Sequence, residues 1–125
     1  MLALIPCSLL IVGMKNISNR PRPTSDLVRV MEPFRFQSFP SSHVFSYTLF
    51  FGLLLVFMCS IKSITKSLRI TLGVVSGFFL VLISPSRIYL GAHWFTDTLG
   101  GVLFGSLVLL PLSFFYFKIN REANS

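Results

Sequence analysis

The chain has 125 residues, of which 53% are hydrophobic and 12% charged, and its mean hydropathy is +0.76. Soluble domains carry about 25% charged residues, so this composition excludes an ordinary water-soluble protein, and the length allows one domain at most. The formal net charge of +7 indicates, in so apolar a chain, a membrane surface or an anionic ligand rather than a nucleic acid as partner.

Polar connections divide the chain into four apolar segments: Met1–Met14, Val44–Ile61, Ile70–Ser84 and Thr98–Phe117. The second and fourth approach the roughly 20 residues that a membrane-spanning helix needs, and the third is short but extendable at either end. The first would rise only about 21 Å as a helix, less than about 30 Å of hydrocarbon. We therefore predict an all-α integral-membrane bundle of about four membrane segments, the first truncated, and expect the chain to begin inside a helix with further membrane helices upstream.

Two glycine pairs have the G-x-x-x-G spacing, Gly73/Gly77 and Gly101/Gly105. Small residues at this spacing allow the backbones of two membrane helices to approach closely. The pairs predict close helix packing, although small residues are common in such helices anyway.

Threading four segments through a bilayer places residues 15–43 and 85–97 on one face, and residues 62–69 and the tail from residue 118 on the other. Basic residues then divide as six (Lys15, Arg20, Arg22, Arg29, Arg35, Arg87) against five (Lys62, Lys66, Arg69, Lys118, Arg121). This count alone does not decide the orientation. If some of the six serve a buried anionic ligand, the face carrying the five becomes cytoplasmic. We interpret Arg29 and Arg35 as solvated or headgroup-facing side chains.

Both histidines, His43 and His93, lie on the face with six basic residues. In "SRIYLGAHWFTD", His93 and Asp97 are four residues apart, and on a helix beginning near His93 the carboxylate can hold an imidazole nitrogen. No serine is obviously placed for activation, so the imidazole itself is a candidate nucleophile. Arg87 follows Pro85, which we expect to start or redirect the chain.

Cations and helix-terminal groups converge on the two histidines in this topology. The stretch "KNISNRPRP" supplies Lys15, Arg20 and Arg22, and Ser41 and Ser42 begin an apolar helix. Guanidinium groups and the N–H groups of a helix N-terminus both bind phosphate oxygens. Because the chain has only four carboxylates, too few for a two-metal phosphatase, we expect a metal-free oxyanion site without a cofactor.

Each of these residues also has a purely structural interpretation. Asp97 favours the first turn of a helix in any case, and His93 with Trp94 could anchor the chain at the membrane interface. Ser41 or Ser42 could be an ordinary N-cap. The basic loop could bind anionic lipids without chemistry, at about 1 kcal/mol per residue. The joint spacing favours the phosphate site over these alternatives.

Taken together, the motifs resemble those of the type 2 phosphatidic acid phosphatase superfamily of integral-membrane lipid phosphatases, whose signature reads K-x6-R-P, then P-S-G-H, then S-R-x5-H-x3-D. This chain has, in the same order, Lys15-x6-Arg22-Pro23, Pro40-Ser41-Ser42-His43 and Ser86-Arg87-x5-His93-x3-Asp97. The match covers residues 15–97, and "DTLGG" after His93 is similar as well. Ser42 departs from the pattern, because the family usually has glycine there.

The resemblance implies a single membrane-embedded phosphatase domain over residues 1–125 with a motif core at 15–97. It implies His93 as the nucleophile that forms a phosphohistidine, Asp97 as the residue that orients it, and His43 as the general acid. The implied phosphate-binding residues are Lys15, Arg22, Ser41, Ser42 and Arg87. Spacing selects Arg22 over Arg20, which is left free for a headgroup or a second phosphate.

The predicted function is metal-independent hydrolysis of a phosphomonoester or diphosphate of a membrane lipid. The predicted location is the plasma (cell inner) membrane, with the site on the extracytoplasmic face. Two alternatives stay open: a phosphotransferase of the same superfamily, and a catalytically silent membrane fragment that only binds lipid or a partner. The expected partners are the bilayer and the lipid phosphate, not nucleic acid, and the oligomeric state is open, a homo-oligomer included.

Overall fold

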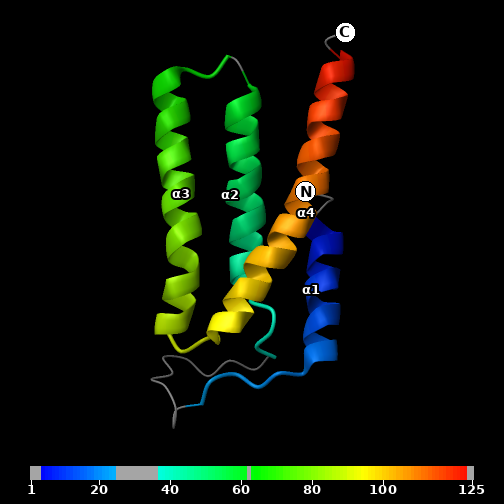
Figure 1. Ribbon diagram of the computed structural model, residues 1–125, viewed down its shortest axis with the longest axis vertical. Helices are drawn as coiled ribbons and strands as arrows, with labels where there is room; N and C mark the ends of the chain where they lie inside the picture. The colour runs from blue at the N-terminus through cyan, green and yellow to red at the C-terminus, as the bar shows by residue number, and fades with distance from the viewer. Residues whose placement is uncertain (1–3, 25–36, 62, 124–125) are drawn as a thin grey trace.

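The computed structural model describes residues 4–24, 37–61 and 63–123, and all regular secondary structure in these ranges is α-helical (Figure 1). There are four helices in chain order: α1 (Leu4–Ser18), α2 (Ser42–Ser60), α3 (Lys66–Tyr89) and α4 (Phe95–Ala123). The predicted all-α fold with four apolar segments is confirmed.

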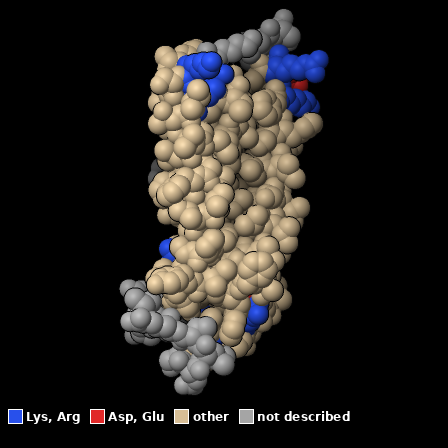
Figure 2. Space-filling view, turned by 60° about the vertical axis from the view of Figure 1, so that its left-hand side comes forward, with Lys and Arg blue, Asp and Glu red and all other residues tan. Residues whose placement is uncertain are grey.

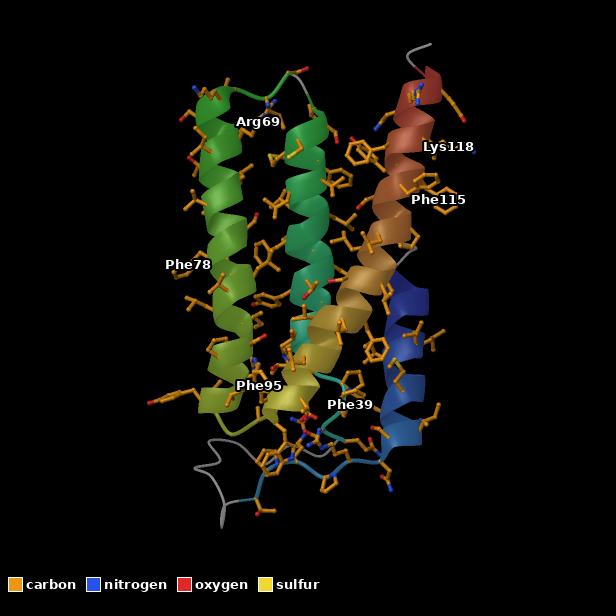
Figure 3. The ribbon with its side chains drawn as sticks, in the orientation of Figure 1. Phe39, Arg69, Phe78, Phe95, Phe115 and Lys118 are labelled. Atoms are coloured by element: carbon orange, nitrogen blue, oxygen red, sulfur yellow. The ribbon has the colours of Figure 1, made fainter. Side chains whose placement is uncertain are left out.

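Three of these helices are long and apolar enough to cross a bilayer: α2 over Ser42–Ser60, α3 over Lys66–Tyr89 and α4 over Phe95–Glu122. Their outer surfaces are apolar, and Phe78 and Phe115, each 58% exposed, point away from the bundle (Figure 3). Lys and Arg gather toward the two ends and leave an uncharged band between them (Figure 2). The chain is therefore an integral membrane protein.

Local capping explains where three helices begin. Ser41 precedes α2 and its hydroxyl accepts from the Val44 N–H, while Thr65 caps α3 in the same way. At the start of α4, the Asp97 carboxylate reaches back and accepts from the Trp94 N–H at 2.8 Å. This is the acidic half of a capping box, three residues into the helix. The structural interpretations of Ser41 and Asp97 given above are thus correct, and they leave room for a second role.

One detail of the prediction is wrong. Pro85 neither starts nor redirects the chain, because α3 runs through it to Tyr89, so the third segment extends at both ends, as the sequence allowed. Proline removes one backbone donor, and membrane helices tolerate that loss. Near Pro85, the Ser86 hydroxyl donates to the Ile83 carbonyl. Helix α4 begins at Phe95, near His93 as predicted, and the cap at its start leaves His93 in the preceding turn.

Helix α2 lies between α3 and α4, and its contact with α4 is the most extensive in the bundle (Figure 1). A Cβ at Gly105 would lie 2.8 Å from Cβ of Thr48, so glycine is what permits this approach. The predicted close packing at Gly101/Gly105 is confirmed. At Gly73 and Gly77 a Cβ would meet nothing within 4 Å in the described part of the chain, so that pair packs against no described helix.

Helix α1 packs against this α2–α4 pair. Its Ile11, which is 4% exposed, forms a core cluster with Phe45 and Leu49 of α2. Partly buried side chains of α4 complete the cluster: Phe104, Val108 and Leu109. The cluster holds α1 alongside α4, so that Lys15 near the end of α1 reaches the same end of the bundle as the start of α4 (Figure 1).

Four helix ends meet at one end of the bundle: the C-terminal ends of α1 and α3 and the N-terminal ends of α2 and α4 (Figure 1). The α2–α3 connection and the C-terminal end of α4 lie at the opposite end, where Arg69 and Lys118 are found (Figure 3). Both histidine-bearing connections therefore share one side, as predicted. Arg29, Arg35 and Lys62 lie outside the described residues.

Candidate active site

The two residues predicted from "SRIYLGAHWFTD" lie side by side at the start of α4. The His93 imidazole is 3% exposed and the Asp97 carboxylate is fully buried. His93 Nδ1 lies 3.6 Å from Asp97 Oδ2, just beyond hydrogen-bonding distance, and it has no other partner in the described part of the chain. A small movement of the ring would complete this bond, which fixes Nε2 as the nitrogen directed away from the carboxylate.

Asp97 has further partners that hold its carboxylate. Oδ2 accepts from the Trp94 N–H at 2.8 Å and from the Ser38 hydroxyl. Oδ1 accepts from Arg20 Nη1 at 2.8 Å, and the same nitrogen donates to the Thr96 hydroxyl. The carboxylate therefore joins three segments of the chain at one buried point.

The segment after α1 is tied to the turn before α4 by three contacts. Arg22 Nη1 donates to the Ala92 carbonyl at 2.7 Å and lies 3.5 Å from His93 Nε2. Trp94 Nε1 donates to the Pro21 carbonyl at 3.1 Å, and the Arg20 guanidinium lies over the Trp94 ring. Burial lowers the pKa of Arg22, while the Asp97 charge opposes that shift. A guanidinium with so high an ordinary pKa keeps its charge, so a cation faces His93 Nε2.

Lys15 lies near the C-terminal end of α1 with only 9% of its surface exposed. Its Nζ donates to the Gln37 carbonyl at 2.8 Å. Ser18, one turn later, donates its hydroxyl to the Phe39 carbonyl at 2.9 Å. These two bonds fasten the segment before α2 to the end of α1, and they leave the other two donors of the ammonium group for an anion.

The N-terminus of α2 faces the start of α4. Ser41 is fully buried, and its N–H donates to the Asp97 carbonyl at 3.0 Å. The N–H groups of Ser42 and His43 have no acceptor in the described part of the chain, as is usual at the first turn of a helix. Unpaired N–H groups at a helix N-terminus are an anion-binding arrangement.

His43 and Arg87 complete the group of predicted residues. His43 is exposed on the first turn of α2, and the charges of Arg87, Arg22 and Lys15, together with His93, act on its imidazole. Arg87 Nε is buried without a partner in the described part of the chain. All eight predicted site residues thus lie at the same end of the bundle.

Ser42 takes the position where the resembling family usually has glycine. Among the described non-glycine residues only Asn19 has a positive φ, so Ser42 does not need the left-handed conformation that glycine favours. Its side chain is half-buried beside the unpaired N–H groups. A serine is therefore compatible with the backbone here and adds a hydroxyl to the site.

The motif comparison did not identify two of the residues that hold Asp97. The motifs do not include Ser38, and they leave Arg20 for a headgroup or a second phosphate without indicating its pairing with Asp97. Their contacts join residues 59 and 77 positions apart in sequence, so no local spacing indicates them. Among the described residues, no group of three or more His, Cys, Asp or Glu could hold a metal ion.

Comparison with known proteins gives consistent matches. The model of the PAP2 superfamily matches residues 1–121. Over 84 residues the chain is 31% identical to phosphatidylglycerophosphatase B of Bacillus subtilis (strain 168). Over 70 residues it is 41% identical to the Escherichia coli (strain K12) protein named "Putative undecaprenyl-diphosphatase YbjG". The crystal structure of a transmembrane PAP2-type phosphatidylglycerolphosphate phosphatase from Bacillus subtilis superposes with a TM-score of 0.77 at 28% identity.

These relatives are longer than the chain. The matched regions cover 67% and 56% of this chain but 41% and 30% of the two relatives. The superposition covers 90% of this chain and 54% of the crystal structure's chain. The chain thus spans about half or less of the length of each relative. It shares the helical membrane fold of the crystal structure.

Proposed function

Because the chain belongs to the PAP2 superfamily, we propose that it removes a phosphate group from a membrane lipid through a phosphohistidine at His93. One observation carries the proposal. The buried imidazole lies between Arg22 at Nε2, 3.5 Å away, and the Asp97 carboxylate at Nδ1, 3.6 Å away. A carboxylate behind Nδ1 stabilises the proton there and leaves the Nε2 lone pair for attack, while a cation beside Nε2 attracts the phosphate that is to be attacked.

In the first step, His93 Nε2 attacks phosphorus and the bond from phosphorus to the lipid oxygen breaks. The developing negative charge on the phosphoryl oxygens is met by three cations, Lys15, Arg22 and Arg87, and by the N-terminal N–H groups of α2. The leaving oxygen takes a proton from His43, whose imidazole is exposed on the first turn of α2.

In the second step, water attacks the phosphohistidine. The nitrogen–phosphorus bond breaks, inorganic phosphate leaves, and His43 accepts the proton from the attacking water, so that both histidines return to their starting state. Asp97 keeps the His93 ring oriented throughout. If an acceptor other than water takes the phosphoryl group, the same site acts as a phosphotransferase.

We propose that this chemistry needs no metal ion. The chain has four carboxylates in all, and of the described ones Asp97 and Glu122 lie at opposite ends of α4. A two-metal site needs several ligands around two ions about 4 Å apart. Here the side chains of Lys15, Arg22 and Arg87 supply the positive charge that metals supply elsewhere.

The substrate class follows from the site and from the relatives. Those relatives are named for phosphatidylglycerophosphate and undecaprenyl diphosphate, a monoester and a diphosphate on lipid tails. We propose that this chain acts on a lipid of one of these two headgroup types. The apolar surfaces of α2, α3 and α4 support a lipid substrate that lies in the bilayer beside the site, and no proposed step requires an oligomer.

We further propose that the site faces the extracytoplasmic side of the plasma membrane. Several of the basic residues at the site end contact catalytic groups and so do not serve as topology signals. At the opposite end lie four basic residues that contact no group of the site (Figure 3): Lys66, Arg69, Lys118 and Arg121. Their positive charges favour the cytoplasmic side.

The test is phosphate release from a panel of lipid monophosphates and diphosphates by the detergent-purified protein. His93→Ala should abolish release and the acid-labile phosphate trapped on the protein, whereas Arg121→Ala, on an exposed residue at the far end of α4, should not. Chelators should leave activity intact. Trapped phosphate that persists in His93→Ala would contradict the nucleophile, and a strict Mg²⁺ requirement would contradict the metal-free step.

A further inference from the structure

The Asp97 carboxylate has more partners than a histidine-orienting residue requires. It is fully buried and accepts from Arg20 on Oδ1 and from Ser38 and the Trp94 N–H on Oδ2. Ser38 and the Trp94 N–H both donate to Oδ2, the oxygen that lies 3.6 Å from His93 Nδ1, while Arg20 holds Oδ1. These donors therefore decide how the carboxylate is oriented toward the imidazole nitrogen.

Several contacts hold the Arg20 guanidinium next to the Asp97 carboxylate. Its guanidinium donates to Asp97 and to the Thr96 hydroxyl, and it lies 5.9 Å above the centre of the Trp94 ring. Arg22, two residues later, instead lies against His93 Nε2. The two arginines of "RPRP" thus act on opposite nitrogens of the His93 imidazole. Arg22 lies next to Nε2, and Arg20 binds the Asp97 carboxylate that lies next to Nδ1.

Ser38 and Arg20 act on the carboxylate as one unit. Ser38 is fully buried, and its N–H donates to the Arg20 carbonyl at 2.9 Å. The next residue, Phe39, packs its ring on Gly100, where a Cβ would lie 2.5 Å from the ring. Glycine at that position lets the segment sit directly on the first turns of α4, with the Ser38 hydroxyl at Oδ2.

From these contacts we propose that Arg20 and Ser38 are positioning residues, which hold the Asp97 carboxylate so that its Oδ2 faces His93 Nδ1. The inference rests on the proposed function, because loss of Arg20 or Ser38 would lower turnover by leaving the nucleophile His93 misoriented. Neither side chain needs to touch the substrate.

Arg20→Ala is the first test. A hydrogen bond to a charged group is worth enough that its loss should lower kcat about ten- to hundredfold, with KM little changed. Arg20→Lys keeps a cation and one donor and should recover part of the loss. Arg69→Ala is the matched control, because the Arg69 guanidinium donates to the Ile61 carbonyl at the opposite end of the bundle, away from Asp97.

Ser38→Ala tests the second donor. It should lower kcat in the same way, by about three- to thirtyfold, since one hydrogen bond to the carboxylate is lost. Ser76→Ala is the control, because Ser76 is also fully buried and donates its hydroxyl to a carbonyl, that of Leu72, in the middle of α3. Folding of each variant is checked by its Tm in detergent, and kcat is expressed per folded protein.

Two further measurements separate positioning from a general loss of stability. Guanidinium ion at a non-denaturing concentration should restore kcat to Arg20→Ala, whose side-chain site is 37% exposed in the native chain, and not to Ser38→Ala. The chain has only two histidines, so ¹⁵N imidazole spectra with His43→Gln for assignment isolate His93. The His93 Nδ1 signal should move in Arg20→Ala and Ser38→Ala, and stay in Arg69→Ala.

The outcomes are distinguishable. If Arg20→Ala raises KM and leaves kcat unchanged, Arg20 binds the headgroup and the proposal is wrong. An unmoved His93 signal in Arg20→Ala also overturns it. If the native chain releases phosphate from no lipid in the panel, the proposed function fails, while the His93 spectra still decide whether Arg20 and Ser38 position the Asp97–His93 pair.

Discussion

The contact between the start of α2 and the first turns of α4 predicts a sharp effect of one methyl group. A Cβ at Gly101 would lie 2.8 Å from the Ser41 carbonyl oxygen and 2.8 Å from Cβ of Val44. The first of these is backbone and cannot rotate away. Gly101→Ala therefore has to move the N-terminus of α2 away from α4, and with it the Ser41 N–H that donates to the Asp97 carbonyl.

The size of the movement follows from the contact distance. Ordinary contact begins at 3.4 Å, so the shift is at least 3.4 − 2.8 = 0.6 Å. Overpacking of this kind costs about 1–3 kcal/mol, against a helix-propensity gain of about 1 kcal/mol for alanine over glycine. A misplacement of about 1 Å at a catalytic group costs about a hundredfold in rate, so we expect kcat to fall about ten- to hundredfold.

The matched control is Gly77→Ala, where a Cβ meets nothing within 4 Å in the described part of the chain. Both variants gain the same helix propensity, so any difference between them reports the contact with α2. The measurements are phosphate release from a lipid phosphate and Tm in the same detergent. If Gly101→Ala matches Gly77→Ala in both kcat and Tm, the close approach of α2 and α4 does not set the geometry of the site, and the reasoning is refuted.

Two other substitutions test the phosphate-binding groups. Ser42→Gly removes a hydroxyl without relieving backbone strain, because Ser42 has no positive φ; KM should rise by up to about tenfold with kcat unchanged, and a gain in kcat would show that the serine obstructs the site. Arg87→Ala removes a half-buried side chain, whose Nε is buried, near the end of α3 and should lower kcat/KM at least about a hundredfold, while Arg121→Ala, on an exposed residue of α4, should not. Equal activities of the two arginine variants would exclude Arg87 from phosphate binding.

Most of the helices could be predicted from the sequence because hydrophobic length is a local property. Apolar runs interrupted by short polar connections place α2, α3 and α4 to within a few residues. The end of α3 could not be predicted, because Pro85 indicates a helix end that the structure does not have. Proline removes one donor, and whether a helix survives that loss depends on its surroundings and not on the proline itself.

The candidate site also has a part that the sequence predicts and a part that it does not. Spaced motifs identify the residues that we propose to bind the phosphate and to act as nucleophile, and the fold brings them to one end of the bundle (Figure 1). Ser38 and the pairing of Arg20 depend on where a turn before α2 lands on α4, which the packing of Phe39 on Gly100 determines. Such contacts leave no periodicity in the sequence, so only the three-dimensional arrangement reveals them.

In the structure, the helix cap formed by Asp97 is compatible with its proposed catalytic role. Its carboxylate caps α4 through the Trp94 N–H, and the same oxygen lies nearest His93 Nδ1. The cap at the start of α4 thus helps to orient the Asp97 carboxylate toward His93. It follows that Asp97→Ala is a poor probe of catalysis, because it uncaps α4 and frees Arg20 at once. Asp97→Asn retains an oxygen for Trp94 while removing the charge that Arg20 and His93 share, so it separates the two roles.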